Sequence, residues 1–178
     1  RSVVHSTDLF FQNLLTMKRG LILVVLFATA QITFAQRSLP KVDLKTMDNT
    51  ATSTTAFDND GKPIVISFWA TWCKPCVKEL NTIAEDYEDW IDETGVKIIA
   101  VSIDDSRNMS KVKPKVNAEM WEYEIYCDPN RDFARAMGVS SVPHTFLLNS
   151  NKEIVWQHKG YVDGDEIELY EKIEELAH

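Results

Sequence analysis

Apolar positions recur along this chain with the two periods that distinguish strands from helices. The apolar run over 63–69 has the length of a buried strand. Apolar residues then recur at spacings of three and four, which predicts an amphipathic helix ending near Gly95. The residues expected on the core-facing stripe of this helix are Val77, Leu80, Ala84, Tyr87 and Ile91.

Strand and helix patterns continue to alternate to the end of the chain. Residues 38–60 are polar, and we expect only short strands or loops there. Pro114 should bend or weaken the helix in which it falls. Further strands are predicted at 96–103, 123–127, 145–148 and 153–156, and further helices at 106–119, at 130–137 and after Asp163.

The final helix carries its own start signal and an apolar face. Asp163 is followed three residues later by Glu166, which is a capping-box arrangement. The alternation of strands and helices predicts an α/β fold with helices layered on a mixed sheet, and residues 36–178 form one domain without repeats or linkers. The apolar face is expected to contain Ile167, Tyr170, Ile173 and Ala177.

The first 35 residues have the pattern of a targeting segment. Met17–Ala35 combines a basic start, an apolar stretch over 21–28 and small residues before Gln36, which predicts a cleaved signal peptide and an exported or periplasmic protein. The apolar stretch is shorter than the roughly 20 residues of a spanning helix, but an uncleaved membrane anchor has the same pattern. Residues 1–16 are interpreted as an upstream segment outside the fold.

Charge and cysteine content narrow the classes of function. The formal net charge is −8 and would become about −10 without residues 1–35, which carry three cationic and one anionic side chain. An acidic surface argues against nucleic acid and anionic membranes as direct partners. Three cysteines are too few for a disulfide-scaffold protein, so a CxxC pair in an exported chain points to function.

The segment Trp72–Cys76 lies where the strand pattern gives way to the helix pattern. Unpaired N–H groups and the helix dipole would stabilise a thiolate at Cys73, which we expect to be exposed, and Cys76 lies one turn further on. The alternatives are a structural disulfide or half of a zinc site. No metal is expected, because the remaining candidate ligands lack metal-site spacing; they are Cys127, His144, His158 and His178.

The string over 68–76, together with Glu79 and the segment over 142–147, resembles the thioredoxin superfamily. Within that superfamily the chain is most similar to exported thiol–disulfide oxidoreductases of the TlpA/ResA type, over roughly 38–177. The resemblance implies a thioredoxin fold with a central mixed sheet flanked by helices. It also implies an N-terminal strand extension and an inserted helix and strand over 106–127.

The resemblance assigns roles to individual residues. Cys73 would be the nucleophile, Cys76 the resolving thiol, Glu79 a group that handles protons, and Pro143 a cis-proline facing the cysteines. Each has an ordinary alternative: Glu79 could be a solvated helix residue, and Pro143 a trans proline that opens a strand. Substrate-binding positions would be Trp72, Lys74, Pro75 and Val142.

Four other residues keep two interpretations each. Ser67 replaces the buried aspartate that thioredoxin has in this strand, which makes Glu79 the stronger candidate for carrying a proton. Trp69 belongs either to the wall of the site or to the core. Cys127 is either a third redox thiol or a buried bystander. His144 lies either near the site or simply within a strand.

The expected function is thiol–disulfide exchange, in the reducing direction, on exported proteins that carry disulfides. The resemblance implies no organic cofactor or metal beyond the redox-active disulfide, a membrane electron donor of the DsbD/CcdA type, and apocytochrome c or copper-site proteins as substrates. We expect a monomer. Two rivals remain: a peroxiredoxin-like peroxidase, whose cysteine context is missing here, and a non-catalytic Cu(I) carrier that uses both thiolates and His144.

Overall fold

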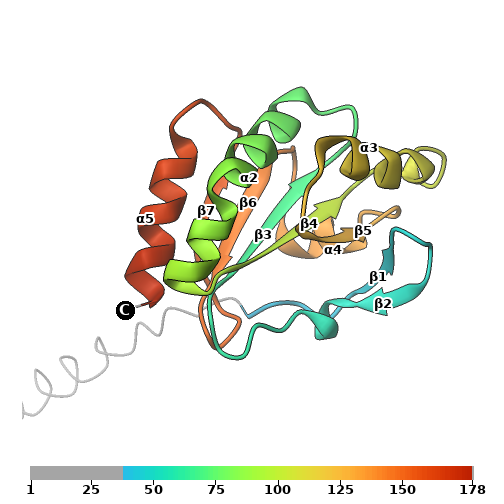
Figure 1. Cartoon of the computed structure of the whole chain (residues 1–178). Helices are drawn as coiled ribbons and strands as arrows, with labels where there is room; N and C mark the ends of the chain where they lie inside the picture. Colours follow the sequence, from blue (N-terminus) through green and yellow to red (C-terminus); the bar gives the residue numbers. More distant parts are fainter. Residues whose placement is uncertain (1–37, 178) are drawn as a thin grey trace, which may run out of the picture. The chain divides into compact units, whose positions relative to one another are not determined.

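A computed structural model describes residues 38–177 of the chain. All of them fall within one compact unit, Gln36–His178 (Figure 1). The predicted signal peptide lies outside the described residues. Within 38–177, no helix combines the length and the apolar character that crossing a membrane requires.

Seven strands form one mixed sheet in the order β2-β1-β5-β4-β3-β6-β7. The central strands β3, β4 and β5 are parallel, and β6 and β7 extend the β3 side with antiparallel pairing. On the other side the hairpin of β1 and β2 pairs with β5, which confirms the N-terminal strand extension. The strands are β1 (Asp43–Thr46), β2 (Ala51–Ser53), β3 (Ile64–Trp69), β4 (Lys97–Ser102), β5 (Glu124–Cys127), β6 (His144–Leu148) and β7 (Ile154–Lys159).

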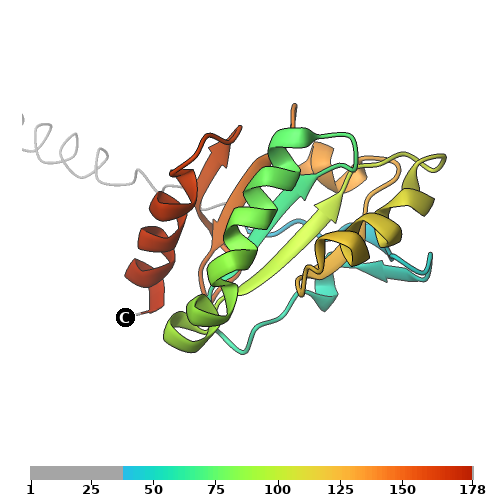
Figure 2. The ribbon, with the colours of Figure 1, turned by 45° about the horizontal axis from the view of Figure 1, so that its top comes forward.

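Helices cover both faces of the sheet, as the sequence predicts. Figure 2 shows α2, α3 and α5 on the near face and α4 behind it. The side chains of β3 agree with this arrangement: Ser67 contacts Glu79 of α2, whereas Phe68 packs against Phe133 of α4. The helices are α2 (Lys74–Thr94), α3 (Val112–Glu119), α4 (Asp132–Met137) and α5 (Asp165–Ala177), with 3-10 turns at Thr54–Ala56 and Met109–Lys111.

Strand β3 is buried along its whole length because it has a strand on each side and a helix on each face. A cluster of aromatic rings on the α4 side joins Phe57, Phe68, Phe133 and Phe146, with ring centroids 5.0–6.0 Å apart. This packing holds β3 in place and so fixes the point where the chain leaves the sheet at Trp69.

The predicted stripe of α2 is partly wrong. Leu80 and Tyr87 are buried, and Val77 packs partly against the core, but Ala84 and Ile91 face solvent. Because the first turn must direct Cys76 inward, the helix is rotated relative to the prediction, and a second set of three- and four-residue spacings forms the buried face. Its members are Cys76, Glu79, Leu80, Ile83, Tyr87, Trp90 and Thr94.

Two other helices begin later than predicted. Between β4 and α3 the chain turns through residues 105–108, because the Asp105 side chain accepts hydrogen bonds from the N–H groups of Arg107 and Asn108. Pro114 then lies in the first turn of α3, where its missing N–H costs little, so it neither bends nor weakens the helix interior.

The start of α5 also differs from the predicted capping box. Asp163 is bound by Lys78 of α2, and the helix starts at Asp165. The carboxylate of Glu166 instead accepts the N–H of Gly164, at 3.1 Å. The helix is consequently rotated so that Ile167 faces solvent while Leu169 and Ile173 are buried; Tyr170 is half-buried.

The corrected face of α2 predicts unequal costs for two identical substitutions. Ile83 is 1% exposed and Ile91 is 41% exposed. We expect Ile83→Ala to lower the free energy of unfolding by about 3 kcal/mol and Ile91→Ala by less than about 1 kcal/mol, because only Ile83 leaves a cavity. Urea denaturation measures both. Equal losses would contradict this orientation of α2.

Candidate redox site

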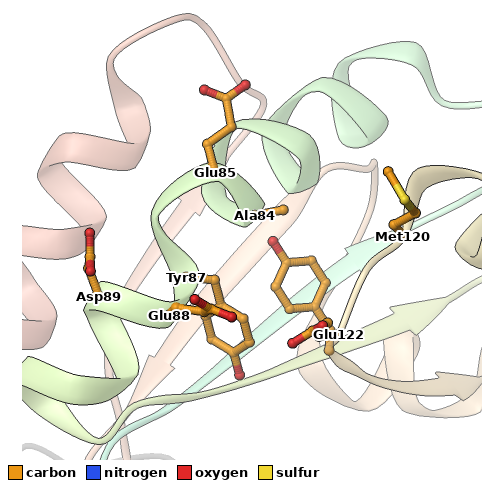
Figure 3. Close-up of a pocket in the computed structure, with 8 residues that line it drawn as sticks. Ala84, Glu85, Tyr87, Glu88, Asp89, Met120 and Glu122 are labelled. Atoms are coloured by element: carbon orange, nitrogen blue, oxygen red, sulfur yellow. The ribbon is translucent and has the colours of Figure 1, made fainter.

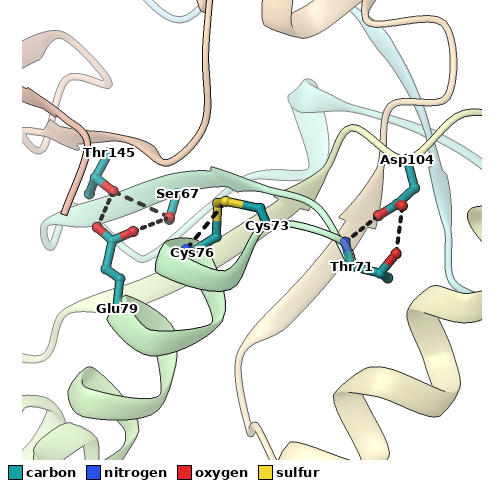
Figure 4. The surroundings of a disulfide bond; sticks show 7 residues. All are labelled: Ser67, Thr71, Cys73, Cys76, Glu79, Asp104 and Thr145. Atoms are coloured by element: carbon teal, nitrogen blue, oxygen red, sulfur yellow. Dashed lines mark hydrogen bonds between the residues drawn. A yellow bond between two sulfur atoms is a disulfide. The ribbon is translucent and has the colours of Figure 1, made fainter.

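The two cysteines of the motif are joined in a disulfide at the start of α2 (Figure 4). Their Cα atoms are 5.3 Å apart. Cys73 is the residue that caps the helix, and its Sγ accepts the N–H of Cys76 at 3.3 Å. The first N–H groups of a helix have no backbone partner within it, so a negative charge on Cys73 Sγ would be stabilised here.

The two cysteines differ in their access to solvent. Cys73 is 5% exposed and Cys76 is fully buried. The expectation of an openly exposed Cys73 is therefore wrong for the disulfide form, because the bond to the buried Cys76 holds the Cys73 sulfur against the protein. Of the two, only Cys73 can be reached from solvent.

A buried carboxylate anchors the loop before the cysteines. Asp104 is fully buried, and its two oxygens accept the N–H and the hydroxyl of Thr71 at 2.8 and 2.7 Å (Figure 4). The carboxylate also accepts the Ser102 hydroxyl at 2.8 Å. Thr71 lies two residues before Cys73, so these bonds fix where the redox loop leaves the sheet.

Sequence reasoning missed Asp104, although a signal was present. Asp104 follows the predicted strand over 96–103 directly, at the carboxyl end of a strand parallel to the one that leads to Cys73. Parallel neighbours end at the same edge of a sheet, so a polar residue there is a candidate for the site.

Glu79 lies on the buried face of α2, three residues after Cys76. It is 5% exposed, which excludes the alternative of a solvated helix residue. The Thr145 hydroxyl donates to Glu79 Oε1 at 2.6 Å, and the Ser67 hydroxyl approaches Oε2 at 3.5 Å (Figure 4). Ser67 and Thr145 belong to the adjacent strands β3 and β6, and their hydroxyl oxygens are 3.2 Å apart. The serine that replaces the thioredoxin aspartate thus faces the carboxyl group of α2.

Burial raises the pKa of Glu79 to about 7, although the hydroxyl groups of Thr145 and Ser67 partly oppose the shift. Loss of hydration penalises the charged carboxylate more than the neutral acid. At neutral pH the group therefore exists in both protonation states, which allows it to donate or accept a proton. Its position three residues after Cys76, on the same buried face, places it near the resolving thiol.

The loop before β6 contains the cis peptide bond Val142–Pro143. Pro143 is buried and its carbonyl accepts the N–H of Gly160 at 2.9 Å. Val142 is half-buried, and within residues 38–177 its backbone N–H and C=O have no backbone partner. On α2, Lys74 and Pro75 are exposed at the helix start, and Trp72 is 64% exposed.

Three residues with open interpretations lie in the protein interior. Trp69 is fully buried and packs edge-to-face on Trp121, with ring centroids 4.9 Å apart, so it is a core residue. His144 stacks on Phe146 and its Nε2 lies 3.1 Å from Gln157 Oε1. Cys127 is fully buried, and burial raises the pKa of its thiol to about 11, which makes it unreactive at neutral pH.

A hollow of about 250 Å³ lies further along α2, facing the segment after α3 (Figure 3). Carboxylates dominate its walls, and no cationic side chain lines it. It contains none of the cysteines or their partners, so we do not connect it with thiol chemistry. We call it the acidic pocket; its charged residues are Glu85, Glu88, Asp89 and Glu122.

Among residues 38–177, no three or more side chains of His, Cys, Asp or Glu are grouped so that they could hold a metal ion.

The raised pKa of Glu79 predicts a dependence of stability on pH. Between the ordinary value of 4.5 and about 7, the folded chain keeps a proton that the unfolded chain has lost. The free energy of unfolding therefore falls as pH rises through this window, by on the order of 3 kcal/mol from this group. In the disulfide form, Glu79→Gln should remove most of this loss between pH 5 and pH 8.

Urea denaturation at the two pH values tests this prediction, with Glu88→Gln as the matched control. Glu88 is an exposed residue of the same helix, so its substitution should leave the pH dependence unchanged. Identical pH dependence in the wild type and in Glu79→Gln would contradict the buried, protonatable carboxyl.

Comparisons with known proteins give consistent results. A sequence model of the AhpC/TSA family matches residues 35–157. Thiol-disulfide oxidoreductase ResA of Bacillus thuringiensis subsp. konkukian is 31% identical over 115 residues, which are 65% of each chain, and ResA of Bacillus subtilis is 33% identical over 98 residues, 55% of this chain and 53% of that one. The chain thus spans 65% of the length of the first of these curated relatives and 53% of the second.

Solved structures support the same fold. An uncharacterized thioredoxin-like protein from Porphyromonas gingivalis is 50% identical, with a TM-score of 0.70 over 78% of this chain and 91% of that one. A putative thiol:disulfide interchange protein DsbE from Chlorobium tepidum also has a TM-score of 0.70, over 80% and 97%. At 22% identity, the second likeness shows the fold alone.

Proposed function

The chain belongs to the AhpC/TSA family and has a thioredoxin-like fold, and on this basis we propose that it is a thiol–disulfide oxidoreductase that reduces disulfides of other proteins. The observation that carries the proposal is the Cys73–Cys76 disulfide at the first turn of α2, in which Cys73 keeps a small solvent exposure of 5% and Cys76 has none. The names of the ResA relatives support the same activity.

The reaction follows from the different access of the two thiols. In the reduced protein, the Cys73 thiolate attacks one sulfur of the substrate disulfide, forms a mixed disulfide, and releases the other substrate sulfur as a thiolate. Cys76 then loses its proton and attacks Cys73 Sγ, which restores the Cys73–Cys76 disulfide and releases the second substrate thiolate. Two electrons pass to the substrate, and the two substrate thiolates take up two protons.

Glu79 is proposed to accept the proton of Cys76 during the second step. A buried thiol ionises reluctantly, and a carboxyl group with a pKa of about 7 can take up the proton without leaving the interior. The charged Glu79 would also repel a neighbouring thiolate, so proton transfer and attack should be coupled. Thr145 and Ser67 hold the carboxyl in place for this transfer.

The remaining roles concern the bound substrate. Val142, whose backbone groups have no backbone partner among residues 38–177, is proposed to pair with an extended segment of the substrate beside Pro143. Trp72, Lys74 and Pro75 would form the exposed surface on which the substrate rests.

The cellular setting is part of the proposal. We infer export by the signal peptide Met17–Ala35, with a retained anchor as the alternative outcome, and action as a monomer. A reductase outside the cytosol needs a supply of electrons, so we propose a membrane donor of the DsbD/CcdA type. Apocytochrome c or copper-site proteins are the proposed substrates.

The two rival functions, a peroxidase and a Cu(I) carrier, are not proposed, because the relatives' names and the paired thiols favour thiol–disulfide exchange.

Two measurements test the proposed activity. The reduction potential of the Cys73–Cys76 pair, measured against glutathione, should lie closer to the roughly −270 mV of thioredoxin than to the roughly −120 mV of DsbA. A value near the second would reverse the direction of the reaction. Cys73→Ser should abolish reduction of insulin disulfides.

Trapping identifies the order of the two thiols. Cys76→Ser should accumulate a mixed disulfide with the substrate through Cys73, because no thiol remains to resolve it. Mass spectrometry of the trapped species locates the bond. Cys127→Ser is the control and should retain full activity, since the Cys127 thiol is buried. A mixed disulfide at Cys127 would contradict the assignment.

A further inference from the structure

A hollow of about 530 Å³ lies between the loop that carries Thr71 and Trp72 and the start of α3. We call it the α3 groove; its walls include Trp72, Lys111, Pro114, Lys115 and Ala118. Trp72 directly precedes Cys73 and is 64% exposed, so one wall of the groove is a large aromatic surface one residue from the attacking cysteine.

The charge of the α3 groove is opposite to that of the whole chain. Among the described residues its walls carry two lysines and no carboxylate, whereas the chain has a net charge of −8. Residues 106–118 contain four cationic side chains and no acidic one. Within this segment Lys113 pairs with Asp48, and Lys115 pairs with Glu119.

Two cations near Trp72 lack such compensation. Within residues 38–177, neither Lys74 nor Lys111 has a carboxylate oxygen within 4.0 Å; Lys111 Nζ instead donates to Asn108 Oδ1 at 2.7 Å. Asp105 is the acidic residue closest in sequence to Lys111, but its carboxylate forms no ion pair with Lys111, and its Oδ1 accepts three hydrogen bonds from Arg107 and Asn108. The charges of Lys74 and Lys111 are therefore available to a partner, whereas that of Lys115 is balanced by Glu119.

The acidic pocket has the opposite charge to the α3 groove. Among the described residues its walls hold four carboxylates and no cation, and it is lined by residues 84–89 of α2 and by the segment that follows α3. A negatively charged partner would be repelled by most of the surface and attracted at the α3 groove, which orients it toward Cys73.

We propose that the α3 groove binds an acidic segment of the substrate polypeptide, adjacent to the cysteine that Cys73 attacks. This deepens the proposed function and rests on it. The substrate class is then a disulfide whose flanking residues include Asp or Glu. An extended segment fits better than a small anion, because the groove combines the apolar surfaces of Trp72, Pro114 and Ala118 with the ammonium group of Lys111. No new bond is made or broken in docking.

Three disulfide peptides test the proposal. They differ only in two residues beside one cysteine, which are Glu-Glu, Gln-Gln or Lys-Lys. The rate of oxidation of the reduced protein by each peptide is followed by tryptophan fluorescence at low salt. We expect the Glu peptide to react about tenfold faster than the Lys peptide, and 0.5 M NaCl to reduce the difference, because salt screens exposed charges.

A charge reversal in the groove should change this ranking. Lys111→Glu should bring the ratio of the Glu rate to the Lys rate to one or below. Lys62→Glu is the matched control: Lys62 is exposed, precedes the opposite end of β3, and changes the net charge equally, so the tenfold ratio should persist.

The outcomes separate the two proposals. Equal rates for all three peptides, with the neutral 2-hydroxyethyl disulfide still reduced, would overturn the groove assignment and leave the proposed function intact. Equal rates together with binding to phosphatidylglycerol vesicles would show that the basic surface recognises lipid instead, which also overturns it. Failure to reduce any disulfide would overturn the proposed function itself.

Discussion

The position of the redox pair depends on the confinement of one strand. β3 is buried on both faces and paired on both edges, so its end at Trp69 cannot shift without disturbing the aromatic core. The Asp104 carboxylate then holds Thr71 by two hydrogen bonds, and Cys73 follows as the cap of α2. The position of the Cys73 sulfur is thus fixed by a fully buried strand, because only residues 70–72 separate the end of β3 from Cys73.

The same confinement explains the protonation state of Glu79. The carboxyl group faces the sheet because α2 must turn Cys76 inward, and Glu79 lies three residues further along the same face. It therefore loses water as the core closes, which raises its pKa to about 7. The hydroxyl groups of Ser67 and Thr145 stabilise the carboxylate, but two neutral donors do not replace full hydration.

Much of the fold could be predicted from local patterns, because strand β3, helix α2 and the CxxC junction carry strong signals within a few residues. The buried face of α2 could not, because two interleaved sets of apolar spacings were available and the sheet selects one. The burial of Glu79 and the role of Asp104 also depend on residues distant in sequence, Thr145 and Thr71. The partner of Asp163 was missed for the same reason, since Lys78 belongs to another helix.

Brief alkylation of the reduced native protein tests the central claim most directly. The account predicts that iodoacetamide at neutral pH labels Cys73 alone, and that Cys76 and Cys127 react only after unfolding; peptide mass spectrometry locates each label. Cys73 is the only one of the three with any solvent exposure, 5% in the disulfide form, whereas Cys76 and Cys127 are fully buried. First labelling of Cys76 or Cys127, or a Cys73 rate as slow as theirs, would contradict the account.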